Sequence, residues 1–379
     1  MYLHEKPNWP KLHWNSETLA ATLAEVRHRQ GRLLGQMGEF GFELREEAVL
    51  RTLTEDVVKS SEIEGERLDR EAVRSSIARR LGMDAGGLKA AADRNVEGVV
   101  EMMLDATRNY DKPLTKKRLL AWHASLFPTG RSGMRPIRVG MWRDDRDGPM
   151  QVVSGPVGQE RVHFEGPHAA RLEQEMANFL DWFNHGPKID PVLTAGMAHL
   201  WFVTVHPFDD GNGRIARAIA DLWLARSEHS DQRFYSMSAQ IREERKAYYD
   251  ILEATQKNGT DITPWQAWFL GCVGRAIGGA QTMLGSVLAK ARFWEGVGQA
   301  PLNERQRLVL NKLLDGFEGK LTTTKWAKFT DSSQDTAYRD ILELIERGIL
   351  VRSAEGGRST SYVLAQRVAA PRMLRRLND

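Results

Sequence analysis

Cysteine, long apolar runs and net charge are all scarce in this sequence, and each shortage excludes a class of protein. The 379 residues include one cysteine, Cys272, which excludes an intramolecular disulfide framework and favours a reducing compartment. No apolar run approaches the roughly 18 residues of a membrane span. The N-terminus also lacks the charged-then-apolar pattern of a signal peptide. We therefore expect a cytoplasmic protein that does not enter a membrane.

The net charge of the chain is close to zero. Its formal value of +3 is too small to indicate nucleic acid as a partner by itself. Residues 301–379 carry 14 Lys and Arg against 10 Asp and Glu, net +4, which leaves −1 for the first 300 residues. The mild basic bias is therefore a property of the C-terminal part of the chain.

Helical periodicity is present along most of the chain, and it predicts a mainly α fold. Apolar residues recur three and four positions apart, as in Leu50, Leu53 and Val57. One region departs from this pattern: two short β-prone runs at 150–155 and 160–166 predict a β-hairpin. The predicted helices cover residues 16–36, 43–64, 68–82, 89–109, 115–126, 167–184, 190–204, 213–228, 243–257 and about 263–295.

The C-terminal part has a different organisation. Residues 298–306, "GQAPLNERQ", have the composition of a linker. Three helical segments follow, and then "VRSAEGGRSTSYVL" predicts two strands around a Gly-Gly turn. This order of elements is typical of a winged helix-turn-helix domain. We expect it to begin at residue 298.

The stretch "HPFDDGNGRIAR" at residues 206–217 concentrates reactive side chains. Its glycine-rich turn leads into a helix, and unpaired N–H groups at a helix N-terminus bind anions. Arg214 and Arg217 lie near one face of that helix and suit phosphate. Asp210 offers a carboxylate to Mg²⁺, and His206 is suited to act as a general base.

This combination of a base, a metal carboxylate and a phosphate cradle predicts transfer from a nucleotide to a hydroxyl. The stretch is not a P-loop, because it lacks Gly-Lys-Ser/Thr and no strand precedes it. Three other histidines, His123, His163 and His199, show no spacing typical of metal ligands, and we expect them to be structural.

The same stretch resembles the signature of the Fic family, His-Pro-Phe-x-Asp/Glu-Gly-Asn-Gly/Lys-Arg-x-x-Arg, at every defined position. Further segments match landmarks of that family, in the same order, over roughly residues 90–290. They are "LLAWHASLF" (119–127), "GMWR" (140–143), "FYSMSAQI" (234–241), "YYDIL" (248–252) and "DITPWQAWFL" (261–270). The resemblance implies a Fic-type helical core with a small β-hairpin flap.

Three parts of the chain follow from this resemblance and from the C-terminal pattern. We predict an N-terminal helical region at 1–89, a Fic catalytic domain at 90–297 and a winged helix-turn-helix domain at 298–379.

Most characterised Fic proteins are adenylyltransferases, so the resemblance implies an activity. AMP would move from ATP to a Ser, Thr or Tyr hydroxyl of a protein, itself included, and pyrophosphate would leave. ATP is then the co-substrate and Mg²⁺ the cofactor. By resemblance His206 is the base and Asp210 holds Mg²⁺, whereas Asp209 occupies the free position of the signature. The expected ATP and phosphate contacts are Phe208, Gly211, Asn212, Gly213, Arg214 and Arg217.

Two more features gain a function from the resemblance. The hairpin at 150–165 is expected to be a flap that pairs with an extended segment of the target, although an ordinary structural hairpin is the alternative. "SSEIEG" at 60–65 fits the family's inhibitory pattern through Ser60, Glu64 and Gly65. Glu64 would then hold Arg217 and disfavour productive ATP; the alternative is a helix that simply ends there.

Other functions stay open at this stage. The protein could be a DNA-binding regulator with a nucleotide-sensing core, but a sensor does not need a general base. A Fic enzyme could also transfer another phosphate-containing group or remove AMP. Residues 332–347 carry two arginines against four carboxylates, so DNA contact through residues 301–379 is not favoured over protein contact. We expect a protein substrate that the sequence does not identify, and a homodimer is one assembly compatible with the chain.

Overall fold

The structure is a computed structural model. It describes residues 1–83, 93–146, 148–156, 159, 161–186, 188–298, 301–315, 317, 319–353 and 360–365. By their contacts, the residues divide into two units, Met1–Gln281 and Thr282–Asp379. The boundary lies inside one long helix, α11 (Thr263–Val297), so the last residues of that helix belong to the second unit. The sequence pattern instead suggested a division at 298, after the helix.

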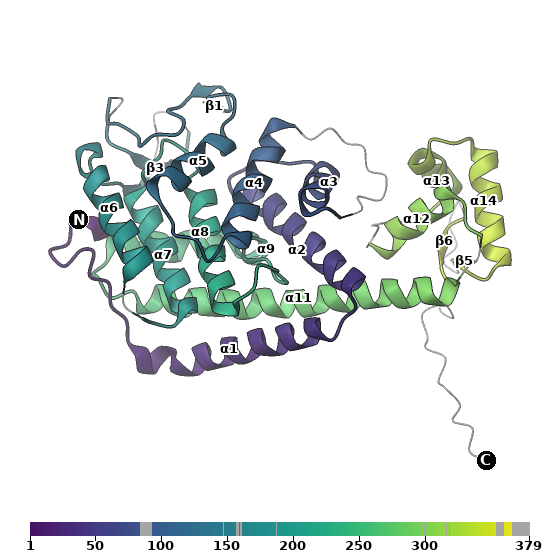
Figure 1. The fold of residues 1–379 in the computed structure, drawn as a ribbon. Coiled ribbons are helices and arrows are strands. Elements are labelled where there is room, and N and C mark those ends of the chain that lie inside the picture. The colour runs from purple at the N-terminus through teal and green to yellow at the C-terminus, as the bar shows by residue number, and fades with distance from the viewer. Residues whose placement is uncertain are drawn as a thin grey trace, which may run out of the picture. The chain divides into compact units, whose positions relative to one another are not determined.

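Helices make up most of the described chain, as the sequence predicts (Figure 1). Each predicted helix is present, and the beginning of the one expected from residue 89 lies outside the described residues. Two short helices, η1 and α9, were not predicted. In the first unit the helices are η1 (Leu3–Glu5), α1 (Ser16–Gly38), α2 (Phe42–Ile63), α3 (Arg70–Leu81), α4 (Arg94–Arg108), α5 (Lys116–Leu126), α6 (Ala169–His185), α7 (Pro191–Val205), α8 (Asn212–Glu228), α9 (Met237–Glu243), α10 (Arg245–Lys257) and the first part of α11.

Helices α7 and α8 form the centre of the first unit. Every residue of α7 from Val192 to Val205 is buried, and a helix that is apolar all round belongs in a core. Asp190 caps the start of α7 by accepting a hydrogen bond from the N–H of Val192 (2.8 Å), and Pro191 occupies the first position, where it has no N–H to leave unpaired. α8 packs along α7 more extensively than any other pair of elements.

The other helices of this unit surround that pair. α4 and α5 pack on each other and on α8, and α2 packs mainly on α9 but also contacts α8 (Figure 1). The carboxylate of Asp56 on α2 accepts hydrogen bonds from the hydroxyl of Ser236 and the N–H of Ser238, at the start of α9. Because Asp56 is buried, these bonds fix α2 against the rest of the unit.

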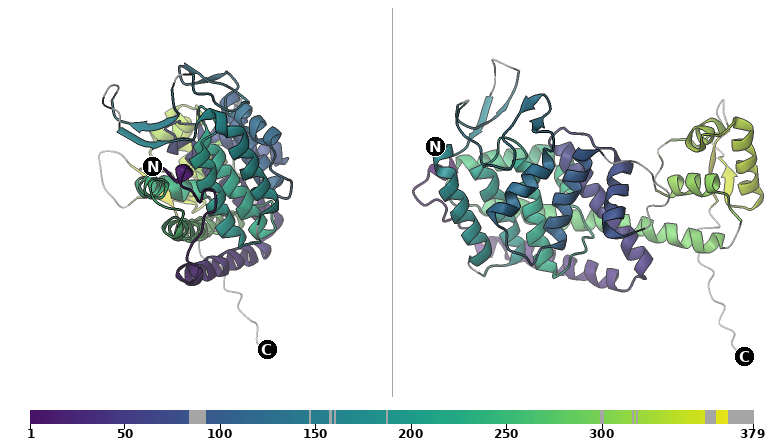
Figure 2. Two further views of the ribbon diagram at one scale, coloured as in Figure 1. Left: turned by 90° about the vertical axis from the view of Figure 1, so that its left-hand side faces the viewer. Right: turned by 45° about the horizontal axis from the view of Figure 1, so that its top comes forward.

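Two β-hairpins complete the first unit. The predicted one consists of β3 (Gln151–Ser154) and β4 (Arg161–Glu165), which pair antiparallel with an irregularity between Val152 and Val153. It projects from the helical body (Figure 2). The second hairpin, β1 (Arg131–Ser132) with β2 (Arg135–Pro136), was not predicted, because two-residue strands show no alternating pattern.

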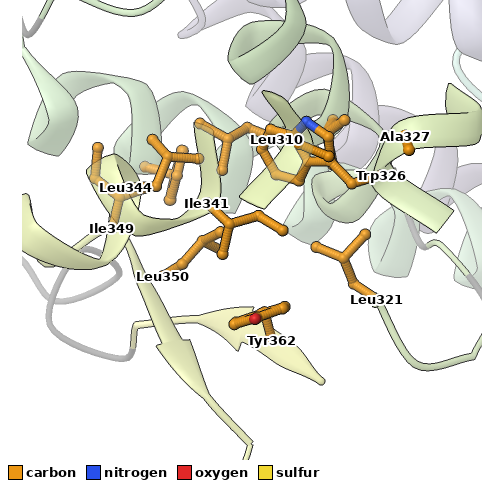
Figure 3. Packing of buried hydrophobic residues seen from close by; sticks show 12 residues of the cluster. Leu310, Leu321, Trp326, Ala327, Ile341, Leu344, Ile349, Leu350 and Tyr362 are labelled. Atoms are coloured by element: carbon orange, nitrogen blue, oxygen red, sulfur yellow. The ribbon is translucent and has the colours of Figure 1, made fainter. Parts of the chain in front are cut away.

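The second unit has its own core. After the last part of α11 come α12 (Glu304–Leu314), α13 (Thr323–Thr330) and α14 (Gln334–Glu346), followed by the antiparallel strands β5 (Leu350–Arg352) and β6 (Tyr362–Leu364). The predicted Gly-Gly turn between these strands lies outside the described residues. Figure 3 shows apolar side chains from all five elements packing together, among them Leu310, Trp326, Ile341, Leu350 and Tyr362.

Helix caps explain where the three helices of the second unit begin. Asn303 and Gln306 form a reciprocal capping box at α12, and the hydroxyls of Thr322 and Ser333 cap α13 and α14.

In neither unit do the described residues include a helix long and apolar enough to cross a bilayer.

Helices α4 and α5, which both pack on α8, approach each other closely at one glycine. Gly98 of α4 is buried, and a Cβ atom there would come within 1.7 Å of the carbonyl oxygen of Ser125 in α5. Gly98→Ala should therefore separate α4 from α5 and lower the free energy of unfolding by about 1–3 kcal/mol. The urea concentration at the midpoint of unfolding would measure this loss.

Gly31→Ala is the matched control for this change. Gly31 lies in α1, and apart from its chain neighbours and the backbone of its own helix no atom lies within 4 Å of the place that a Cβ atom would take there. Alanine should therefore stabilise this helix by roughly 0.5–1 kcal/mol. Equal midpoints for the two variants would show that α4 and α5 do not approach so closely.

Candidate active site

The stretch at 206–217 forms the loop between α7 and α8 and the first turns of α8. His206 ends α7 with a positive φ of 49°, and Gly211 precedes α8 with a φ of 80°. A histidine in this left-handed region needs support. Arg143 supplies this support. The side-chain Nε of Arg143 donates to the carbonyl of His206 (2.7 Å), and the backbone N–H of Arg143 donates to the carbonyl of Pro207 (2.9 Å). Arg143 is buried and belongs to the quoted landmark "GMWR", but no function for it was predicted.

The imidazole of His206 is oriented by the helix that it ends. Its Nδ1 lies 3.1 Å from the carbonyl oxygen of Val203. Because a carbonyl only accepts, Nδ1 carries the proton and Nε2 keeps its lone pair. Burial lowers the pKa of His206 to about 4, and the nearby Arg143 also lowers it. The ring is therefore neutral at pH 7 and can take a proton at Nε2.

Phe208 and Asn212 hold the loop from the inside. Phe208 is fully buried and stacks on His123, with ring centroids 4.1 Å apart and planes 5° apart. The Asn212 side chain accepts from the N–H of Phe208 (3.0 Å) and donates to its carbonyl (2.8 Å). The side chains of these two predicted ATP contacts thus shape the loop.

The two acidic residues of the loop attach the β1–β2 hairpin to it. Asp209 accepts a hydrogen bond from the N–H of Arg138 (2.8 Å). Asp210 accepts from the N–H of Gly211 (2.5 Å) through one oxygen and from the hydroxyl of Ser132 through the other. Ser132 was missed from the sequence, because it lies far from the motif in a hairpin with no strand pattern.

The donor set at Asp210 suits Mg²⁺ bound together with a nucleotide. Mg²⁺ prefers one or two carboxylates and completes its shell with water and phosphate oxygens. Asp210 offers one carboxylate at the start of α8, with the Ser132 hydroxyl beside it. Nowhere in the described ranges do three or more His, Cys, Asp or Glu side chains gather as they would around a metal held by protein alone.

The start of α8 has backbone and guanidinium groups that could bind an anion. The side chain of Arg217 is 1% exposed and that of Arg214 is 5% exposed. Nη1 of Arg217 and Nε of Arg214 are buried and find no hydrogen-bond acceptor within the described part of the chain. Gly211 allows the turn, and Gly213 has no side chain to cover the N–H groups behind it.

The end of α2 reaches this site, where the sequence predicts an inhibitory contact. Nη2 of Arg217 donates to Oε1 of Glu64 (2.8 Å) and to the carbonyl of Ser60 (2.9 Å), while Nε donates to the Ser60 hydroxyl (2.9 Å). Burial lowers the pKa of Arg217 and the Glu64 carboxylate raises it, with a net upward shift. Glu64 lies directly over the helix start: a Cβ atom on Gly213 would meet its Oε1 at 2.2 Å.

A second carboxylate from the same segment pairs with the other arginine of the motif. Oε2 of Glu66 accepts from Nη1 of Arg214 at 2.7 Å. The guanidinium of Arg214 also lies over the ring of Phe127, 5.0 Å from its centroid. Glu66 was missed from the sequence because the inhibitory pattern ends at Gly65; the only available signal was a further glutamate directly after it, in "EGE".

The three histidines that the sequence suggested to be structural make structural contacts. His123 stacks on Phe208, and Nε2 of His199 hydrogen-bonds the hydroxyl of Tyr248 (2.9 Å). His163 of β4 lies 2.6 Å from Glu253 of α10, so it fastens the β3–β4 hairpin to the helical body.

The environment of His206 makes a prediction that does not depend on any reaction. We expect the ¹⁵N signals of this imidazole, identified by their loss in His206→Ala, to report a proton on Nδ1 at pH 7 and to titrate near pH 4. Burial disfavours the charged ring, so protonation requires a pH below the ordinary range of about 6.5. A titration near 6.5, or a proton on Nε2, would contradict this arrangement.

Comparison with known proteins gives a family match over the residues of this site. Residues 113–224 match the Fic/DOC family, and residues 2–83 match a domain described as of unknown function (DUF4172). The chain is 33% identical over 131 residues to the protein adenylyltransferase Fic of Culex quinquefasciatus, a match that covers 33% of this chain and 25% of that protein. It is 34% identical over 113 residues to the one of Nematostella vectensis, covering 29% and 25%.

These matches span about a quarter of the length of the curated relatives. A solved structure, a Fic family protein from Desulfovibrio desulfuricans G20, superposes over 94% of this chain and 98% of its own, with a TM-score of 0.52 and 20% sequence identity. That likeness concerns the fold alone. The family match includes α7, the loop and the motif at the start of α8. Residues 113–224 of this chain therefore resemble the Fic/DOC family over the loop and motif that form this site.

Proposed function

We propose that the protein is an adenylyltransferase that moves AMP from ATP to a Ser, Thr or Tyr hydroxyl of a protein, itself included. The observation that supports this most directly is the pairing of a neutral His206, with Nε2 unprotonated, with a helix start that carries two buried guanidinium groups. The first group suits a hydroxyl nucleophile, and the second suits a chain of phosphates.

The reaction follows from these groups. Nε2 of His206 takes the proton of the target hydroxyl as its oxygen attacks the α-phosphorus of ATP. The bond between that phosphorus and the oxygen bridging to the β-phosphate breaks, and pyrophosphate leaves. Arg214 and Arg217 offset the charge of the phosphates. Asp210, oriented by Ser132 and Gly211, would hold Mg²⁺, which neutralises phosphate charge when bound.

The proposed enzyme is restrained by its own α2. The carboxylate of Glu64 forms an ion pair with the guanidinium of Arg217. It also lies over Gly213, where a phosphate would approach the backbone N–H groups. A phosphate and a carboxylate cannot share that place, because like charges at such distances repel strongly in a partly shielded site. ATP would therefore bind in a less productive position until Glu64 moves.

The β3–β4 hairpin is proposed to present the target. Each of its strands has one hydrogen-bonded neighbour among the described residues, so an edge is open to an added strand. Val153 is 48% exposed and Val162 is 37% exposed, which offers an extended segment apolar contacts beside the backbone. The contact of His163 with Glu253 would hold the hairpin in place.

For the second unit we propose a winged helix-turn-helix that contacts protein rather than DNA. Three helices followed by an antiparallel hairpin support the first part. On α14, Asp335 and Glu346 are exposed beside Arg339, so the solvent side has no excess of positive charge. DNA binding requires such an excess.

His206→Ala should abolish transfer and leave ATP binding nearly unchanged. A general base contributes roughly 10²–10⁴-fold to rate, and the imidazole is not part of the phosphate contacts. Arg214→Ala should weaken both ATP binding and transfer, because it removes phosphate neutralisation. Retention of label from ATP labelled at the α-phosphate would measure transfer, and a separate binding titration would measure affinity.

Label from the γ-phosphate is the control for this assay. Retention of γ-label and not α-label would mean that the protein is a kinase, and our proposal would be wrong. Loss of ATP affinity in His206→Ala would instead contradict the role of the imidazole.

Glu64→Gly should raise transfer of AMP strongly over a weakly active wild type. The change frees Arg217 and opens the space over Gly213, so that ATP can place its α-phosphate for attack. A net pair energy of about 1.4 kcal/mol corresponds to about tenfold. Auto-labelling from α-labelled ATP at equal protein concentration gives the comparison, and equal rates would mean that residues 60–65 only end a helix.

A further inference from the structure

We propose that Glu66 is a second inhibitory carboxylate, which holds Arg214 while Glu64 holds Arg217. This proposal rests on the function proposed above, because it concerns access of ATP to the same site. It implies that a nucleotide must displace two carboxylates from two guanidinium groups, and that removal of Glu64 alone releases the site only in part.

The turn at the end of α2 places both glutamates. Gly65 has a φ of 85°, a conformation that residues with a side chain rarely adopt. The N–H groups of Glu64 and Glu66 both donate to the carbonyl of Ser61, at 3.1 and 3.0 Å. The backbone therefore folds back on the last turn of the helix, and the residues on each side of Gly65 point to the same neighbouring helix, α8.

The two ion pairs with α8 have similar lengths and lie near one face of that helix. Arg214 and Arg217 are three residues apart and share a face near the helix start. Glu66 accepts from Arg214 at 2.7 Å, and Glu64 accepts from Arg217 at 2.8 Å. The two guanidinium groups that would neutralise phosphates are thus both paired with carboxylates. These carboxylates belong to residues two positions apart in the sequence.

Burial is unequal within each pair. The side chains of Arg214 and Arg217 are 5% and 1% exposed, whereas those of Glu66 and Glu64 are 37% and 30% exposed. A buried guanidinium without an anionic partner is costly, but a half-exposed carboxylate can return to water at little cost. The arginines therefore stay in place and exchange partners, and the glutamates are the parts that move.

The other glutamate of this segment provides a matched control. Glu62 lies one position before Ile63, pairs with Lys59 (3.0 Å) and approaches Arg242 (3.5 Å). These two cations are its ionic partners among the described residues, and neither belongs to the motif on α8. A change at Glu62 therefore removes a negative charge from the same turn without releasing Arg214.

The test compares Glu66→Ala, Glu64→Ala, the double variant and Glu62→Ala in the full chain. We would measure the dissociation constant for ATP in the presence of Mg²⁺, and auto-labelling from α-labelled ATP, after confirming equal thermal unfolding. Loss of a partly exposed ion pair has a modest effect, so Glu66→Ala should tighten ATP binding by about threefold to fivefold. The double variant should bind more tightly than Glu64→Ala, and Glu62→Ala should match the wild type.

The outcomes separate the two proposals. If Glu66→Ala binds ATP like the wild type, or the double variant binds no more tightly than Glu64→Ala, then Glu66 does not restrain the site. A gain from Glu62→Ala equal to that from Glu66→Ala would also overturn the proposal, since it would reflect general charge. If ATP binding tightens as expected but no variant retains α-label, the role of Glu66 stands and the proposed transfer reaction fails.

Discussion

Two guanidinium groups buried at the start of α8 are the constraint on which the site depends. The side chains of Arg214 and Arg217 are 5% and 1% exposed, and an uncompensated buried charge costs several kcal/mol. They therefore require anionic partners at all times. The end of α2 supplies such partners within the chain, and the phosphates of a nucleotide would supply them otherwise. The inhibitory contact that we propose would then be the resting state of the site.

The conformation and protonation of His206 depend on the groups around it. Arg143 holds the carbonyls of His206 and Pro207, so the histidine can keep its left-handed conformation. Val203 fixes the position of the proton on Nδ1. The stack of Phe208 on His123 holds the loop beneath them. The imidazole is thus neutral at pH 7 because burial and Arg143 lower its pKa, and this outweighs the upward effect of the carboxylates of Glu64 and Asp210.

The features that a local pattern determines could be predicted from the sequence. Helical periodicity indicated the mainly helical fold, and the dense motif at 206–217 identified the loop at the start of α8. The contact of Glu64 with Arg217 was expected only through the resemblance, since nothing local joins residues so far apart. Ser132 and Glu66 could not be found in this way: each touches the motif from a distant segment, and neither belongs to a recognisable pattern. The boundary between the two units could not be read from the sequence either, because α11 continues as one helix through residue 281.

The position of α2 would make the proposed restraint both stable and reversible. Asp56 lies deep in the interior and binds the start of α9 through Ser236 and Ser238, so the helix stays docked. The turn after Ile63, with its partly exposed glutamates, faces the two arginines at the start of α8. In the function that we propose, displacement would break these two charge pairs and leave the helix packing intact, so ATP would compete with the glutamates alone. Two such pairs would oppose ATP more strongly than one, because both carboxylates would have to leave before both guanidinium groups could bind phosphate.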